Sequence, residues 1–426
     1  MNCEFSKLKI FSIILLLLVG AFSIFCVLNK NSYKTFTKLI DDPYKEIRNY
    51  KAKKQLKEEM QGLSAKLKEA PPSWFLNQIK DDFSRISKLP ITKNAVERTY
   101  KLHQNDHNFF RVKILNNKLY IDEIYDPKKC NSGKKFLANA LFKLLSYVKL
   151  PDLDVVFYEG DIFNGSLSND YAPIFTYALS TKNSKNRILI PDVLTLETWT
   201  TLYHQILEVN NKISWESKSN LAYWRGSATG VVDNNNYKSY EYNINNYFDF
   251  PRYKLVDFSS RNPILVDAKF TSFCNATMDV KEILEKKYPK VKSASRKEHL
   301  IHKMQITMDG NTCTYPGYLW RLLSNSVNLK QESGDVQWFY RLFKPWVHYV
   351  PVKQDLSDLQ EKIEWVRAHD SEAKDISENA SREVQENIKP SDLYYYLAVL
   401  LQEYSKLQDF KPEYDESFVE IKSIIK

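Results

Sequence analysis

The sequence has few cysteines and lacks the short motifs by which several classes of enzyme are recognised. Its five cysteines include no C-x-x-C pair and form no paired framework, which favours folding without disulfide bonds. No Gly-Lys-Ser/Thr sequence closes a Walker loop, and no G-x-G-x-x-G fingerprint is present. His103 and His107 have helical spacing, but without an H-E-x-x-H motif or an obvious third ligand they do not indicate a metal site.

The net positive charge is also not concentrated in any one part of the sequence. The 61 Lys and Arg residues exceed the 52 Asp and Glu residues by enough to give a net charge of +9, spread along the whole chain. No block of basic residues interleaved with aromatic residues stands out, so nucleic acid is not expected as a partner. A modest positive balance suits an anionic ligand or a lipid surface without specifying either.

The longest apolar stretch lies at the N-terminus. Residues 10–28 are nineteen residues without a charged side chain, which is long enough to cross a bilayer as a helix. We therefore expect a single-pass membrane anchor within residues 1–34, in a bacterial inner membrane or in the endoplasmic reticulum or Golgi. A cleaved signal peptide is the alternative, although its apolar core would be shorter. The charged residues 35–72 predict a helical stalk that ends at Pro71 and Pro72.

Strand and helix patterns alternate in two blocks, residues 73–212 and 213–370. In the first block, residues 109–125 alternate around Asn116-Asn117, which predicts a hairpin, and two short apolar runs predict buried strands at 155–158 and 187–191. In the second block, strands are predicted at residues 219–224, 264–268, 303–308 and 326–329. This order predicts an α/β fold of two Rossmann-like domains, with the helices of residues 371–426 packing back on the body.

A polar turn follows the strand at 219–224. It reads Arg225-Gly226-Ser227-Ala228-Thr229-Gly230. Glycine lets backbone N–H groups approach an anion closely, and hydroxyl and guanidinium groups donate to its oxygens. The turn is suited to a diphosphate, but its spacing alone leaves an ordinary strand–turn open.

Several carboxylates lie near predicted strand ends. Asp161 follows the strand at 155–158, where open α/β sheets place ligands, although an Asp after a strand is more commonly a turn or helix cap. Asp152-Leu-Asp154 resembles the D-x-D pair of metal-dependent transferases, but its apolar strand follows the carboxylates, so we interpret it as the start of a strand. Glu332, after the strand at 326–329, is a candidate for the ribose hydroxyls or for a helix cap.

Longer segments resemble glycosyltransferase family 90, which contains protein O-glucosyltransferases, fungal capsule-associated proteins and bacterial lipopolysaccharide-A-type enzymes. The landmarks run from about Pro151 to Phe410, and their order matches that of the family. They are PDLDVVFYEGD, SWESKSNLAYWRGSATG, NPILVDAKFT, MDGNTCTYPGYLWRLLSNSVNLKQES and WFYRLFKPWVHYVPVKQDLSDLQEKIEW. The resemblance implies a GT-B-like fold of two Rossmann-like domains. It also implies an inverting transfer from a UDP-sugar that needs neither a metal nor another cofactor.

The resemblance also implies roles for individual residues. Asp161 falls on the catalytic base, and Ser227 and Arg252 fall on contacts to the pyrophosphate and uridine. Arg225 and Gly226 complete the phosphate-binding turn.

A second turn, Asp309-Gly310, follows the strand at 303–308, and the resemblance implies that it also binds the nucleotide sugar. The chain departs from the family beyond this turn. Tyr315-Pro316-Gly317 stands where animal members carry an arginine that reaches the diphosphate, and Arg321, about one helical turn further on, is a candidate replacement. Ala228 also stands where animal members have an arginine.

We therefore expect a membrane-anchored enzyme that moves a hexose, most simply glucose, from a UDP-sugar to a glycan or lipopolysaccharide acceptor. Two alternatives remain open at this point. One is a protein serine O-glucosyltransferase of a secretory compartment, and the other is a non-catalytic protein that binds a nucleotide sugar.

Overall fold

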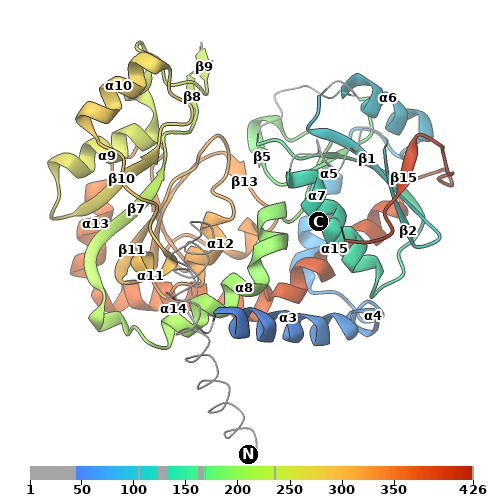
Figure 1. Ribbon diagram of the computed structural model, residues 1–426, viewed down its shortest axis with the longest axis horizontal. Coiled ribbons are helices and arrows are strands. Elements are labelled where there is room, and N and C mark those ends of the chain that lie inside the picture. The colour runs from blue at the N-terminus through green and yellow to red at the C-terminus, as the bar shows by residue number, and fades with distance from the viewer. Residues whose placement is uncertain are drawn as a thin grey trace, which may run out of the picture. The chain divides into compact units, whose positions relative to one another are not determined.

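The computed structural model describes residues 45–103, 106–122, 132–161, 167, 169–234 and 237–424. The fold is mixed α/β, with a six-stranded and a five-stranded sheet (Figure 1). The chain divides into a short unit, residues 1–55, and a large unit, residues 56–426. Both sheets belong to the large unit. The short unit is described only where helix α3 (Lys45–Gln61) begins.

The membrane location expected from the sequence requires correction. The predicted anchor at residues 10–28 lies outside the described residues. In the part of the chain that the structure describes, no helix combines the length and the apolar character needed to cross a bilayer. The predicted stalk does contain helices, α3 and α4 (Leu63–Lys66), but α3 is rich in charged side chains.

The six-stranded sheet is mixed rather than parallel. Its order is β15-β2-β1-β3-β4-β6. The pairs from β15 to β3 are antiparallel, whereas β3, β4 and β6 run parallel. The strands are β1 (Phe109–Leu115), β2 (Lys118–Asp122), β3 (Leu153–Tyr158), β4 (Ile174–Thr176), β6 (Arg187–Leu189) and β15 (Phe418–Glu420). Asn116 and Asn117 have φ angles of 50° and 63°, the left-handed values of a two-residue hairpin turn, so the predicted hairpin is confirmed.

The five-stranded sheet is entirely parallel, in the order β10-β7-β11-β12-β14. Its strands are β7 (Ser219–Ser227), β10 (Val266–Ser272), β11 (His302–Thr307), β12 (Val327–Gln331) and β14 (Val350–Val352). β11 and β12 are buried along their whole length, as is usual for parallel strands covered by helices on both faces. Helices α9 (Pro251–Arg261), α12 (Gly317–Leu322) and α13 (Leu359–Ala368) pack against β10, β11 and β14 respectively.

Each sheet has its own hydrophobic core. We call the six-stranded sheet with its helices the first lobe, and the five-stranded sheet with its helices the second lobe. The first lobe contains α5 (Ser73–Ser84), α6 (Lys93–His103), α7 (Ser132–Leu145) and α8 (Val193–Asn210), and the second also contains α10 (Met278–Lys287) and α11 (Arg296–Leu300). Helix α14 (Asp370–Asn387) packs on β12, whereas α15 (Pro390–Ser405) returns to the first lobe and packs against α5, α7 and α8.

Smaller elements complete the fold. Strand β5 (Leu179–Ser180) of the first lobe pairs antiparallel with β13 (Asp335–Val336) of the second, so the lobes share a short ladder. Strands β8 (Val232–Asn234) and β9 (Tyr237–Ser239) form a separate hairpin. The 3₁₀ turns are η1 (Thr181–Asn183), η2 (Trp215–Ser217), η3 (Tyr247–Asp249) and η4 (Tyr340–Leu342).

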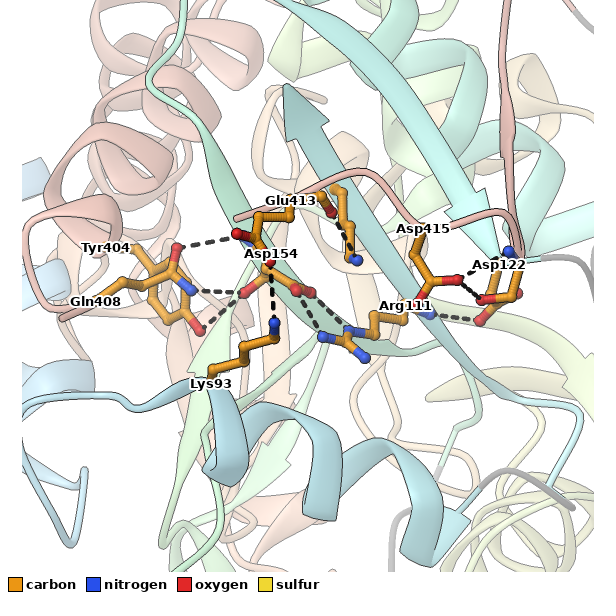
Figure 2. Close-up of polar contacts among 10 residues, drawn as sticks. Lys93, Arg111, Asp122, Asp154, Tyr404, Gln408, Glu413 and Asp415 are labelled. Atoms are coloured by element: carbon orange, nitrogen blue, oxygen red, sulfur yellow. Dashed lines mark hydrogen bonds and ion pairs between the residues drawn. The ribbon is translucent and has the colours of Figure 1, made fainter. Parts of the chain in front are cut away.

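The carboxylates of the D-x-D-like pair have structural roles. Figure 2 shows the guanidinium of Arg111 facing Asp154. Its Nε and Nη2 donate to the two carboxylate oxygens at 2.7 and 2.6 Å, and both residues are buried. Gln408 bonds the backbone of Asp154, which fastens the C-terminal segment to β3. Asp152 accepts the backbone N–H of Asn116 at 2.7 Å. The interpretation of this pair as the start of a strand is confirmed.

Candidate active site

Both lobes border a polar cavity of about 150 Å³. Three of the predicted site residues line it, namely Asp161, Asp309 and Gly310. The first lobe also contributes cations, and the second contributes loops that follow its strands. Further lining residues include Lys182, Arg187, Gly230, Asn311, Gln331, Ser333 and Gly334. The cavity therefore lies at the carboxyl ends of strands, where α/β sheets bind ligands.

The Asp161 carboxylate faces the second lobe. Asp161 follows β3 and is exposed. Its Oδ2 accepts from Nδ2 of Asn311 at 3.2 Å, and its Oδ1 accepts from the hydroxyl of Tyr315. Both donors belong to the loop after β11, so the predicted base is in contact with the lobe that carries the predicted diphosphate-binding residues.

Arg252 lies near the first turn of α9 and joins the ends of two parallel strands. Its Nε donates to the carbonyl of Asp309 at 2.9 Å, and its Nη2 donates to that of Met308 at 3.0 Å. Its Nη1 donates to the Ser227 carbonyl at 3.1 Å and to the Thr229 hydroxyl at 2.6 Å. These partners are neutral, and no carboxylate lies within ion-pair distance of Arg252 among the described residues. Burial lowers the pKa of the guanidinium. The nearby Asp309 and Asp161 carboxylates oppose this lowering of the pKa, although neither forms a direct ion pair with Arg252.

Asp309 and Gly310 form the turn that Arg252 holds. The Asp309 carboxylate accepts from the backbone N–H and the hydroxyl of Thr314 at 3.1 and 3.0 Å, and also from the Ser333 hydroxyl. A Cβ on Gly310 would lie 3.0 Å from Nη2 of Arg252. Asp309 thus shapes the loop, and the glycine lets the backbone lie directly against the guanidinium.

The segment Arg225-Gly226-Ser227 does not line the cavity, because β7 continues through it. Arg225 Nη2 pairs with the Asp267 carboxylate on β10 at 2.7 Å, and its Nη1 bonds the Asp267 carbonyl. A Cβ on Gly226 would lie 2.4 Å from the Trp224 ring, so this glycine is needed for packing. The Ser227 hydroxyl is hydrogen-bonded to the hydroxyl of Ser272 and to the thiol of Cys274. The side chains of Arg225 and Ser227 are therefore bonded to other parts of the second lobe.

Arg321 and Glu332 also lie outside the cavity lining. Arg321 is buried on α12, where its Nη1 bonds the Gly317 carbonyl at 3.0 Å and its guanidinium lies 4.4 Å from the centre of the Trp320 ring. Burial lowers the pKa of Arg321 to about 9. Glu332 is exposed, and its backbone N–H bonds the Val352 carbonyl at 2.7 Å.

The sequence did not single out the two cations of the first lobe. Arg187 begins β6 and Lys182 lies in η1, and both line the cavity. Burial lowers the pKa of Arg187 to about 10. A basic residue at the start of an apolar strand was a visible signal, since residues 188–190 are buried aliphatics. Asn311 and Tyr315 were likewise not singled out for the contacts that they make with Asp161.

Three carboxylates, Asp161, Asp309 and Asp335, and two cations, Lys182 and Arg187, line a cavity that two α/β lobes share, and together they define a candidate enzyme site. The model of Glycosyl transferase family 90 matches residues 68–425. The chain therefore belongs to glycosyl transferase family 90, which confirms the resemblance read from the sequence.

Three similar proteins are all described as protein O-glucosyltransferases. Protein O-glucosyltransferase 3 of Homo sapiens is 28% identical over 79% of this chain and 62% of that protein. Protein O-glucosyltransferase 2 of Danio rerio is 30% identical over 79% of this chain and 63% of that protein. This chain thus spans less than two thirds of the length of these relatives. Protein O-glucosyltransferase 1 of Rattus norvegicus is 25% identical over 79% of each chain.

A solved glycosyltransferase from Rickettsia africae shows a weaker similarity. It aligns with a TM-score of 0.35 at 10% identity, over 63% of this chain and 74% of that one. A score this low carries no argument about fold or site.

Proposed function

We propose that this chain is a glycosyltransferase that moves a hexose, most simply glucose, from a UDP-sugar to a hydroxyl group of a protein. Family membership and the names of the relatives support the class of reaction. The observation that carries the proposal is the placement of the Asp161 carboxylate beside the Arg252-held loop in one cavity. The finer fold description, two Rossmann-like domains arranged as in GT-B enzymes, belongs to the same proposal. The parallel strands of both sheets support it.

The choice of a protein acceptor revises the preference stated from the sequence. A glycan or lipopolysaccharide acceptor was favoured there, whereas the relatives named above are described as O-glucosyltransferases of proteins. Their names favour the alternative of a protein serine O-glucosyltransferase. The nature of the acceptor is therefore a point for direct test.

The proposed reaction is a single displacement. Asp161 takes the proton of the acceptor hydroxyl as its oxygen attacks the anomeric carbon of the donor sugar. The bond from that carbon to the β-phosphate oxygen breaks, and UDP leaves with the bonding electrons. Attack on the face opposite the leaving group inverts the anomeric centre. Asp161 suits the role of base because its carboxylate reaches the cavity and faces the second lobe.

The departing UDP carries negative charge that cations can stabilise. Lys182 and Arg187 line the cavity from the first lobe, and Arg252 lies directly behind the lining residue Gly310. We assign the diphosphate to these three cations rather than to Arg225, whose charge is paired with Asp267. That no metal or other cofactor is needed stays a prediction from the family resemblance.

A donor screen tests the proposal directly. The full chain is incubated with UDP-glucose and other UDP-sugars, with and without a folded protein acceptor, and released UDP is measured. Asp161→Asn should lower turnover by about 100-fold or more, the usual contribution of a general base, and should leave the Kd for UDP unchanged. Asp170→Asn, a surface carboxylate paired with Lys88, is the matched control and should keep full activity. Tight UDP binding without turnover of any donor would instead identify a non-catalytic protein.

A further inference from the structure

The loop after β11 contacts both Arg252, which we assign to the diphosphate, and Asp161, the proposed base. At its start, the carbonyls of Met308 and Asp309 accept from Arg252. Two side chains further along, Asn311 and Tyr315, donate to the two oxygens of Asp161. Residues 308–315 therefore connect a diphosphate-side cation with the carboxylate of the other lobe.

The direction of the Asn311 bond is fixed by its surroundings. Its Oδ1 accepts from the backbone N–H of Gly230 at 3.2 Å and from Nδ2 of Asn275 at 2.7 Å. A backbone N–H can only donate, so the amide oxygen must face Gly230. The amide nitrogen must then face Asp161, because a flipped amide would place two donors together. Asn275 is held in turn by the Tyr240 carbonyl at 3.0 Å.

Tyr315 is equally constrained. Its hydroxyl donates to Asp161, and its ring meets that of Tyr177 edge-on with centroids 6.2 Å apart. Burial raises the pKa of Tyr315, and the nearby Asp161 carboxylate raises it further. The hydroxyl therefore keeps its proton at neutral pH and remains a donor.

We propose that Asn311 and Tyr315 are positioning residues for Asp161, which orient its carboxylate and tie it to the loop that Arg252 holds. This inference rests on the proposed function of Asp161 as the base. It gives a role to the departure at Tyr315, where the family resemblance expects an arginine on the diphosphate. In this chain the position serves the base instead.

The arrangement leaves the base competent. An ionised carboxylate offers about four lone-pair sites, and the two positioning bonds occupy one on each oxygen. A further site remains on either oxygen for the acceptor hydroxyl. The two donors restrict rotation of the carboxylate, so that its free lone pairs keep one direction.

Tyr315→Phe tests the proposal, because it keeps the ring and removes only the hydroxyl. We expect kcat for sugar transfer to fall by about tenfold or more, since a misdirected base loses rate steeply, while the Kd for UDP stays within about twofold. The acid limb of the kcat/KM profile should also move to higher pH, because a hydrogen bond donated to a carboxylate favours its charged form. The other groups that face Asp161 electrostatically, namely Tyr158, Tyr177 and Arg252, are unchanged in this variant.

Two further variants complete the experiment. Tyr318→Phe is the matched control, since its buried hydroxyl has no hydrogen-bond partner among the described residues, and it should leave kcat and the pH profile unchanged. Asn311→Ala removes the second donor independently and should reproduce both effects of Tyr315→Phe. A loss of activity without a shift of the pH profile in both variants would overturn the positioning role.

The outcomes separate this inference from the proposal on which it rests. Wild-type turnover that Tyr315→Phe and Asn311→Ala leave unaltered would overturn the inference and keep the glycosyltransferase. If the wild-type chain turns over no donor, the proposed function fails, and this inference fails with it.

Discussion

Two arginines, the buried Arg111 on β1 of the first lobe and the half-buried Arg252 on α9 of the second, are balanced in different ways. Arg111 meets the Asp154 carboxylate through two bonds, at 2.7 and 2.6 Å (Figure 2). Arg252 bonds three backbone carbonyls and one hydroxyl. Arg111 directs Nε and Nη2 at one carboxylate, whereas the hydrogen-bond partners of Arg252 are all neutral groups.

This difference in charge pairing distinguishes Arg111, which stabilises the fold, from Arg252, which we assign to the site. A buried charge is costly unless it is paired, and a paired one gains little from an added ligand. Arg111 and Asp154 fasten β1 to β3 on the face that the C-terminal segment covers. Arg252 does not itself line the cavity but lies against Gly310, which does, and it forms no ion pair within the described chain that would compete with an anionic ligand. The following tests bear on this contrast.

The largest expected effect is on the stability of the first lobe. Asp154→Ala leaves Arg111 buried and unpaired, so the free energy of unfolding should fall by about 3–5 kcal/mol, measured by urea denaturation. The double variant Arg111→Met with Asp154→Leu should recover most of that loss. UDP affinity of the folded fraction should not change, and a marked loss of affinity would break the distinction between scaffold and site.

A smaller effect is expected on ligand affinity in the second lobe. Arg252→Met should raise the Kd for UDP by about tenfold or more, from the loss of charge-assisted interactions of about 1.5–3 kcal/mol. Arg225→Met is the control, because the charge of Arg225 is already paired with Asp267. Calorimetric titration of both variants with UDP measures the two Kd values. Equal losses of affinity would mean that internal neutralisation does not predict which arginine binds the ligand.

A third buried ionisable group, Asp82, is paired with Arg85, but this pairing does not fully offset the cost of its burial. Burial raises the pKa of Asp82 to about 7, although the neighbouring Arg85 opposes the shift. An unfolded Asp titrates near 3.9, so the folded state binds more protons between about pH 4 and 7. Stability should therefore fall as pH rises through this window, by up to about 1.4 kcal/mol per pH unit. Asp82→Asn should remove this slope in denaturation curves recorded across the window, and an unchanged slope would refute the assignment.

The smallest effect concerns the close approach of Gly310 to Arg252. Gly310→Ala adds a Cβ 3.0 Å from Nη2 of Arg252 and 3.1 Å from Oγ1 of Thr229, which forces the guanidinium to shift. We expect a cost of about 1 kcal/mol in UDP binding, typical of mild overpacking. Gly62→Ala is the control, since its Cβ would lie 3.4 Å from its nearest neighbour, the Glu59 carbonyl. Affinity that is equal in the two variants would show that Arg252 tolerates the displacement.

Local patterns in the sequence were sufficient for most of the secondary structure. The Asn116-Asn117 turn, the buried run of β3 and four strands of the second sheet were predicted, because side-chain periodicity and turn residues act over a few neighbours. The fifth strand of that sheet, β14, was not predicted. The antiparallel half of the first sheet could not be predicted in full. Strand β15 joins it from the far end of the chain, and such pairing depends on contacts that no local pattern records.

The candidate site was less accessible to sequence reasoning. A turn was expected from Arg225, but β7 runs through Ser227. Strand alternation then places Ala222 and Trp224 in the second core and directs Arg225 to the other face, toward Asp267. Arg187 was missed because its importance comes from the second lobe lying opposite. Residues gathered from both lobes become neighbours only when the whole chain is folded.

The short β5–β13 ladder beside the cavity has a mechanical consequence. Its register sets Ser180 opposite Asp335 and Leu179 opposite Val336, and the N–H of Thr181 bonds the Gly334 carbonyl at 2.7 Å. Sliding one lobe past the other would leave these peptide groups unpaired, whereas a rotation about the ladder would not. The ladder therefore fixes how the two lobes are registered against each other at this edge of the cavity.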